Sequence, residues 1–189
     1  MAALLGIFSA FGLSASAGLN AYIPLLVVGV LAHYTDAIKL TPPFDTLANP
    51  WILILLGILL LIEMLADKIP AVNHINDLIQ TFVRPVAGAI AFAAGTNVVH
   101  GISPILALAC GLLVAGSVHL VKSAAVRPFV TAATAGVGNI PVSIAEDVTS
   151  TAVSFASVLL PLAIVVLAAI LVLALFWWWA RPAGDAESV

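Results

Sequence analysis

Long apolar stretches constrain the fold of this chain more than any other feature of its sequence. A helix needs about 20 apolar residues, or roughly 17 to 25, to cross the hydrocarbon core of a bilayer. Apolar residues make up 63% of the chain and charged residues 8%, a balance that a soluble domain could not bury. We therefore expect an all-α integral membrane protein of about six transmembrane helices, at about 3–33, 51–67, 84–99, 103–121, 127–146 and 152–180.

Charge and cysteine content exclude several classes of protein. The chain has a net charge of −3 and only six basic residues, which argues against binding to nucleic acid. Its single cysteine, Cys110, excludes an internal disulfide. Ala15-Ser16-Ala17 resembles a signal-peptide cleavage site, but no Lys or Arg occurs in the first thirty residues. We therefore interpret the first apolar stretch as a retained span.

Gly, Asn and Pro are expected to break some of these helices. The first stretch is interrupted at 14–20, with Pro24 just beyond. Residues 71–83 alternate between apolar and polar positions at spacings of three and four, which predicts an amphipathic helix lying at the membrane interface. We treat 1–181 as one transmembrane domain and 182–189 as a mobile tail.

An internal repeat of helical hairpins is a further prediction, with chance similarity as its alternative. Pro50, Gly57 and Lys68 recur 54 residues later as Pro104, Gly111 and Lys122, and Val83-Arg84-Pro85 recurs 43 residues later as Val126-Arg127-Pro128. The two hairpins would cover about 50–99 and 103–146. Each contains a Gly-Asn break, and the first stretch has another, at Asn97, Asn139 and Asn20. These breaks either converge on one substrate site or bond neighbouring helices.

The basic residues predict the orientation of the spans. Lys68 and Arg84 flank one loop, and Lys122 and Arg127 flank another two spans later. The positive-inside rule then places both loops, and both termini, in the cytoplasm. Lys39 is the exception.

Polar chemistry concentrates in the segment from Glu63 to Arg84, which holds five of the fifteen charged residues. Glu63 and Asp67 are four residues apart and share one face of a helix. Carboxylates within a span exchange protons or bind cations in many membrane proteins. The alternative is a structural ion pair of Glu63 or Asp67 with a basic residue: Lys68, Arg84, Lys122 or Arg127.

Other polar residues are weaker candidates. His74 and Asp77 could join the two carboxylates in a metal site, or could form a polar interfacial face. His119 and Lys122 lie one turn apart and could bind carboxylates or a phosphate head group, unless Lys122 is a snorkelling anchor. Glu146-Asp147 is expected at the outer end of the fifth span, as a helix cap or a cation-attracting vestibule.

The motif Glu63-x3-Asp67-Lys68-x-Pro70, followed by His74, Asp77 and Arg84-Pro85, and the early segment 16–20 together resemble a known family. This is a family of small bacterial inner-membrane proteins defined by a domain of unknown function, DUF4126. The likeness extends from about Gly6 to the last span. The resemblance implies a membrane location, and it brings no catalytic or binding residue with it.

We expect a small transporter or channel for an ion or small polar solute, with its carboxylate site near the cytoplasmic side. One alternative is an enzyme acting on a phospholipid or isoprenoid-phosphate head group, and another is a membrane scaffold without chemistry. The expected partners are the lipid bilayer and further copies of the chain. We expect no cofactor beyond a monovalent or divalent cation.

Overall fold

The computed structural model describes residues 2–67, 70–96 and 102–180, although not every side chain within them. These ranges form helices and contain no strand, which confirms the all-α class for this part of the chain. The elements are α1 (Ala2–Leu19), α2 (Tyr22–Tyr34), η1 (Phe44–Ala48), α3 (Pro50–Ala66), α4 (Pro70–Thr96), α5 (Pro104–Val121), η2 (Lys122–Val126), α6 (Arg127–Thr134), α7 (Asn139–Leu159) and α8 (Pro161–Ala180).

Three helical segments of the described chain are long and apolar enough to cross a membrane. They are Leu78–Thr96, Pro104–Thr134 and Asn139–Leu159, and three shorter apolar helices cover Leu4–Leu19, Tyr22–Tyr34 and Pro50–Ala66. Many large apolar side chains are exposed, and some of them, such as Trp51, Ile105 and Phe129, are more than 70% exposed. Such a surface suits lipid and not water, so the chain is a membrane protein.

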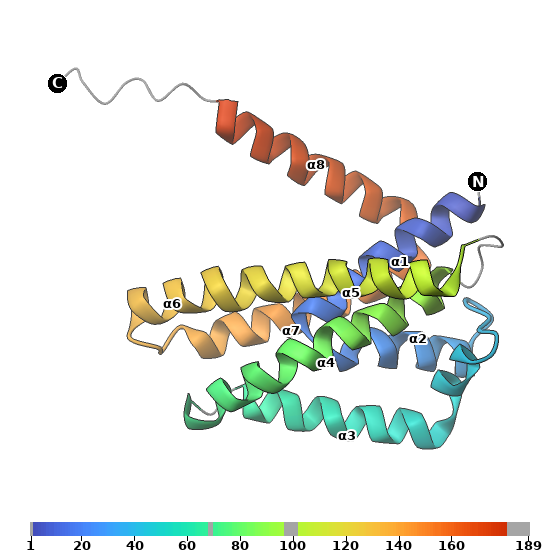
Figure 1. Ribbon diagram of the computed structural model, residues 1–189, viewed down its shortest axis with the longest axis horizontal. Helices are drawn as coiled ribbons and strands as arrows, with labels where there is room; N and C mark the ends of the chain where they lie inside the picture. Colours follow the sequence, from blue (N-terminus) through green and yellow to red (C-terminus); the bar gives the residue numbers. More distant parts are fainter. Residues whose placement is uncertain (1, 68–69, 97–101, 181–189) are drawn as a thin grey trace.

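Helix α1 forms the centre of the bundle and packs against α4, α5 and α7 (Figure 1). Helices α4 and α5 approach so closely that a Cβ atom on Gly111 would lie 2.6 Å from Phe92 Cβ and 2.7 Å from Ala89 Cα. Small residues at such crossings let helix backbones meet in membranes. By contrast, α8 points away from the bundle (Figure 1).

The break expected in the first apolar stretch is present, and it changes the direction of the chain. Helix α1 ends at Leu19, and the Oδ1 atom of Asn20 accepts hydrogen bonds from the backbone N–H groups of Tyr22 and Ile23, at 3.1 and 3.2 Å. These are donors that the first turn of a helix leaves unsatisfied. Helix α2 then runs back toward the end of the bundle where α1 starts (Figure 1). The stretch 3–33 is therefore two helices at an angle.

The boundary expected near residue 84 is absent, because the amphipathic segment 71–83 and the next span form one helix, α4. Pro85 lies inside it. Proline removes one backbone hydrogen bond, a loss that membrane helices tolerate where neighbours satisfy the freed groups. The predicted separate interfacial helix is thus the first part of a longer helix.

The boundary expected between 121 and 127 is also absent. Helices α5 and α6 join through the π-helical turn η2, so that one helix runs from Pro104 to Thr134. A π-helical turn is wider than an α-helical one, which relieves the clash between the ring of Pro128 and the backbone before it. The chain reverses instead at 135–138, where Ala135 and Gly136 have φ values of 51° and 86°. The second predicted hairpin is thereby displaced, and the last predicted span is interrupted between α7 and α8.

Candidate functional site

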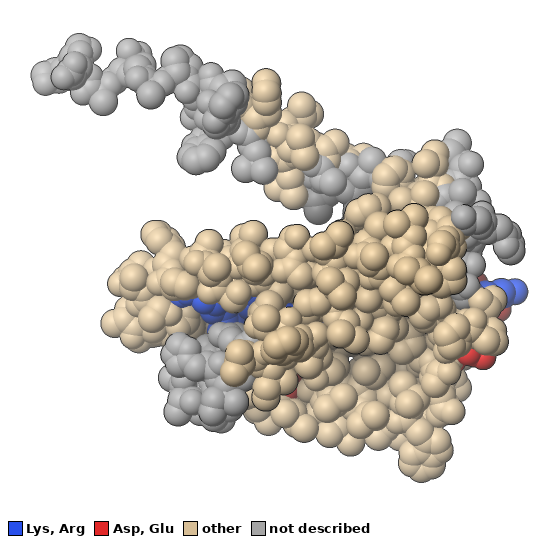
Figure 2. All heavy atoms as spheres, in the orientation of Figure 1, with Lys and Arg blue, Asp and Glu red and all other residues tan. Residues whose placement is uncertain are grey.

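Six ionisable side chains from five elements meet inside the bundle. They are almost completely buried. Five of the six residues are 5% exposed or less, and the side chain of the sixth, Glu146, is 11% exposed. On the face drawn in Figure 2, Lys and Arg atoms are visible in a recess beside α6, within a surface that is almost entirely uncharged. We call this group the charge cluster: Glu63, Asp67, Arg84, Lys122, Arg127 and Glu146.

Asp67 lies at the centre of the charge cluster, just beyond the end of α3. Its Oδ2 atom accepts a hydrogen bond from Arg127 Nη2 at 3.2 Å and lies 3.9 Å from Arg84 Nη2 and 4.0 Å from Lys122 Nζ. Its Oδ1 atom accepts from Asn76 Nδ2 at 2.8 Å. The three cations and the hydrogen bond all favour the ionised form of this carboxyl. Asp67 is therefore an anion held by several helices.

Glu146 of α7 completes the charge cluster, although we expected it from the sequence at the opposite end of its span from Arg127. Its Oε2 atom lies 2.8 Å from Lys122 Nζ and 3.0 Å from Arg127 Nη2. The sequence placed Glu146 a whole span away from these two residues. They meet because the helix continues past Arg127 and reverses only at 135–138, so that α7 returns alongside it. Lys122 Nζ also donates to the carbonyl oxygen of Leu19, at 3.1 Å, where α1 ends.

Arg84 links the charge cluster to His119. Its Nη2 atom donates to Glu63 Oε1 at 2.9 Å, and its Nη1 atom lies 3.2 Å from His119 Nδ1. Because a guanidinium has only donors, Nδ1 accepts, and the proton of the neutral imidazole belongs on Nε2. That atom lies 3.2 Å from Thr81 Oγ1. His119 is therefore a neutral partner of Arg84.

The buried face of α7 is entirely polar. Its buried residues recur at spacings of four and three, which places them on one side of the helix. Near the charge cluster, Ser143 Oγ donates to Asp67 Oδ2 at 3.4 Å, and Asp147 Oδ1 accepts from Asn20 Nδ2 at 2.9 Å. The buried residues are Ser143, Asp147, Ser150, Ser154 and Ser157.

Further along α7, hydroxyl groups replace charges. Ser16 Oγ of α1 lies 2.7 Å from both Ser150 Oγ and Ser154 Oγ, and Ser150 Oγ also donates to the carbonyl oxygen of Ser16 at 3.1 Å. All three serines are fully buried. Together with Asn20, the polar residues of α7 and Ser16 form a row that starts at the charge cluster, and we call it the polar seam.

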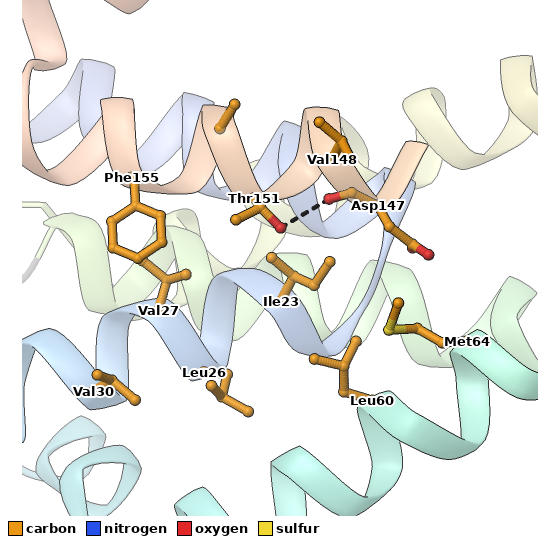
Figure 3. Close-up of a pocket in the computed structure, with 11 residues that line it drawn as sticks. Ile23, Leu26, Val27, Val30, Leu60, Met64, Asp147, Val148, Thr151 and Phe155 are labelled. Atoms are coloured by element: carbon orange, nitrogen blue, oxygen red, sulfur yellow. Dashed lines mark hydrogen bonds between the residues drawn. The ribbon is translucent and has the colours of Figure 1, made fainter. Parts of the chain in front are cut away.

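A groove opens between α2, α3 and α7 (Figure 3). Its volume is ≈ 590 Å³, and apolar side chains such as Leu26, Leu60 and Phe155 form most of its wall. Asp147 and Thr151 are its polar residues, and Thr151 Oγ1 donates to the carbonyl oxygen of Asp147 at 2.8 Å. The groove thus connects the apolar surface with the polar seam.

The structure brings together half of the candidate residues. Asn20 adjoins the charge cluster through Asp147, but Asn139 donates to Thr131 Oγ1 in the α6–α7 turn at 2.8 Å, apart from Asn20. The Gly-Asn breaks at Asn20 and Asn139 therefore do not converge. The candidates that meet are Glu63, Asp67, Arg84, His119, Lys122 and Arg127.

Four candidates fall outside what the structure describes. Lys68 and Asn97 lie outside the described residues, as do the side chains of His74 and Asp77. Among the described residues, no group of three His, Cys, Asp or Glu side chains could hold a metal ion. A metal site that includes His74 and Asp77 stays a prediction.

Sequence reasoning missed the polar seam and the role of Glu146. The signal for the seam was present, because five polar residues at spacings of 4, 3, 4 and 3 occur in 143–157.

No curated protein and no solved structure matches this chain. The sequence does match one protein family over residues 7–181, and the chain therefore belongs to DUF4126, a family described as a domain of unknown function.

Proposed function

We propose that this protein is a small membrane transporter or channel for an ion or small polar solute, with the charge cluster as its binding site. The polar seam is the observation that carries the proposal. From Ser143 to Ser157 it follows α7 for about 21 Å at 1.5 Å per residue, a large part of a hydrocarbon core roughly 30 Å thick. The hydroxyl, amide and carboxylate groups of the polar seam could bind an ion or polar solute along this path. A bundle that served only to pack apolar helices in lipid would not require such a row of polar groups.

The pairing of the charges supports exchange of an ion. Ionisable groups inside a membrane are costly and mark ion or substrate pathways. In the charge cluster, three carboxylates face three cations, and Arg127 Nη2 bonds both Asp67 and Glu146. When a proton or cation binds to one of these two carboxylates, Arg127 remains paired with the other. Binding therefore leaves no buried guanidinium unpaired, a state that would cost several kcal/mol.

Flux through proteoliposomes tests this proposal. Purified wild-type protein and Glu146→Gln are reconstituted, and the fluxes of H⁺, Na⁺ and K⁺ are measured with fluorescent indicators. We expect at least one flux in the wild type and a loss of at least tenfold in Glu146→Gln, because Gln removes the charge and keeps the shape. Asp45→Asn is the matched control, since Asp45 is exposed and lies in η1. Absence of every flux from folded, inserted wild-type protein would reject the proposal.

Finer features of the membrane arrangement belong to the same proposal. They are six crossing segments, a hairpin repeat, cytoplasmic termini, a bacterial inner-membrane location and a homo-oligomer. The start of α1 and the 135–138 turn lie at opposite ends of the bundle (Figure 1). Labelling of single cysteines at Thr35 and at the exposed Val137, from each side of the membrane and in a Cys110→Ala background, therefore tests the orientation of the bundle. A further cysteine at Ala2 tests the location of the N-terminus separately.

An enzyme acting on a lipid phosphate head group is the second candidate, and the groove favours it. An acyl chain fits an apolar groove, and Asp147 in its wall lies next in sequence to Glu146 of the charge cluster. Lys122 and Arg127 would then bind phosphate. Turnover of radiolabelled phospholipid or isoprenoid phosphate by the purified protein, without ion flux, would support this candidate over transport.

A further inference from the structure

Three buried polar atoms beside the charge cluster have no hydrogen-bond partner among the described residues. They are Glu63 Oε2, Gln80 Oε1 and Arg84 Nε. The residues that carry them are 1%, 2% and 0% exposed. Buried polar groups are nearly always satisfied, and each unsatisfied one costs about 1–3 kcal/mol. Three such atoms on neighbouring residues therefore indicate a ligand.

The contacts of these residues bring their side chains together between α2, α3 and α4. Arg84 already holds Glu63 through the other carboxylate oxygen, at 2.9 Å. Gln80 and Arg84 are four residues apart and share one face of α4. Tyr22 of α2 lies near Gln80 and interacts electrostatically with both Glu63 and Arg84. These side chains thus offer two acceptor atoms and one donor atom without partners among the described residues.

The two acceptor atoms and the one donor atom determine which ligand can bind them. A metal ion would suit the two oxygen atoms but would face the guanidinium of Arg84. An anion would suit Arg84 but would face the carboxylate of Glu63. One water molecule donates two hydrogen bonds and accepts one from Arg84 Nε, which satisfies all three atoms.

We propose that Glu63, Gln80 and Arg84 hold one water molecule, and that Glu63 takes up and releases a proton through it. A hydronium ion transfers its proton to Glu63 Oε2, where an O–H bond forms, and the remaining water molecule stays bound to the three residues. Release is the reverse step. This inference rests on the proposed transport function and deepens it, since it names the proton as the transported or coupled ion.

Glu63 differs from the other carboxylates in its pairing. Asp67 accepts on both oxygen atoms, and Glu146 Oε2 binds two cations, whereas Glu63 binds one cation through one oxygen. Arg84 Nη2 lies 2.9 Å from Glu63 and 3.9 Å from Asp67. Protonation of Glu63 at Oε2 removes the negative charge next to Arg84 and leaves Oε1 as a neutral acceptor, so that Asp67 attracts Arg84 more strongly than before. Proton uptake thereby changes the pairing of the whole charge cluster.

The charged and titratable groups around Glu63 come from every element packed against it. Asp67 lies just beyond the end of the same helix, and Arg84 makes the direct contact. Lys122 acts on Glu63 from η2, His119 reaches it only through Arg84, and Tyr22 faces it from α2. One anion and two cations therefore surround the carboxyl, so its proton affinity depends on the charge cluster as a unit.

Infrared difference spectroscopy detects the protonated carboxyl directly and needs no transport. Spectra of the protein in lipid nanodiscs are compared between about pH 8 and about pH 5, a range above the usual pKa of exposed carboxylates. We expect one new C=O band of a protonated acid, shifted in D₂O. The band should disappear in Glu63→Gln and persist in Asp45→Asn, a matched exposed carboxylate.

The Gln80→Leu variant tests whether a water molecule bridges Gln80 and Glu63. It also provides a test if Glu63→Gln does not fold. We expect the band of this variant to move to higher frequency, since the water loses one of its acceptors and binds the carboxyl less firmly. An unmoved band contradicts the water bridge. No band in folded wild-type protein, or a band that survives in Glu63→Gln, overturns the proton site.

The flux measurement separates this inference from the proposed function. A Glu63 band without any ion flux supports the proton site and rejects transport. Ion flux without the band supports transport and rejects the proton site.

Discussion

The two halves of the buried face of α7 meet their neighbours in different ways. The N-terminal half, with Ser143 and Asp147 beside Glu146, faces charged and amide groups from several elements. The C-terminal half, with Ser150 and Ser154, faces the single hydroxyl of Ser16 on α1. A buried charge needs several partners to replace its water, whereas a hydroxyl group needs one or two. The same helix face therefore requires many helices at one end and one at the other.

This difference predicts where the protein is sensitive to substitution. Removal of a member of the charge cluster leaves its partners buried without compensation. Removal of a serine hydroxyl leaves neighbours that can bond each other or a backbone carbonyl, as Ser157 Oγ does with Val153. The expected losses of stability decrease from the charge cluster to the polar seam.

The largest loss is expected for Asp67→Ala. Asp67 accepts from Asn76 and Arg127 and lies within 4.0 Å of Lys122. Breaking a buried ion pair by removing one partner costs about 3–5 kcal/mol. Denaturant unfolding of the protein in mixed micelles measures this loss. Asp45→Ala, at an exposed carboxylate, should change stability by less than about 0.5 kcal/mol. Similarly small losses of stability in both variants would contradict a central role of Asp67 in the charge cluster.

Glu146→Gln should cost less, because the amide keeps a hydrogen-bond acceptor and the side chain is 11% exposed. Hydrogen bonds to charged groups contribute about 1.5–3 kcal/mol, and we expect a loss in that range. A double-mutant cycle with Lys122→Met measures the coupling of the pair, which the 2.8 Å contact predicts to be at least about 0.5 kcal/mol. Additive effects of the two substitutions would show that this contact is absent in the membrane.

The smallest measurable loss belongs to Ser16→Ala. Hydrogen bonds between membrane helices contribute about 0.6 kcal/mol on average and at most about 1.7 kcal/mol. Ser16 lies 2.7 Å from two other serines, so we expect a value in the upper part of this range. Ser117→Ala is its control, since Ser117 Oγ is exposed and bonds the carbonyl oxygen of Leu113 in its own helix. Equal losses in both variants would mean that the polar seam adds nothing to stability.

The sequence predicted the helical class and much of the charge cluster for physical reasons. Apolar runs report lipid exposure directly, and charges in such runs must find partners. This reasoning selected Glu63, Asp67, Arg84, Lys122 and Arg127, whose side chains meet in the structure.

The position of Glu146 could not be predicted, because it depends on where the chain reverses. The π-helical turn lets the helix pass Pro128, and the reversal at Ala135 and Gly136 then decides what α7 faces. Proline usually marks the end of a helix, so sequence reasoning divided the chain at Arg127. That division placed Glu146 at the far end of its span.

Proton and cation flux through Ser16→Ala, Ser117→Ala and wild-type protein in the same proteoliposomes tests the central claim most directly. If the polar seam is the path, Ser16→Ala loses flux by roughly tenfold or more, which corresponds to about 1.4 kcal/mol. Ser117→Ala should keep the wild-type rate. Equal rates in all three proteins, with all three folded and inserted, would contradict a path along the polar seam.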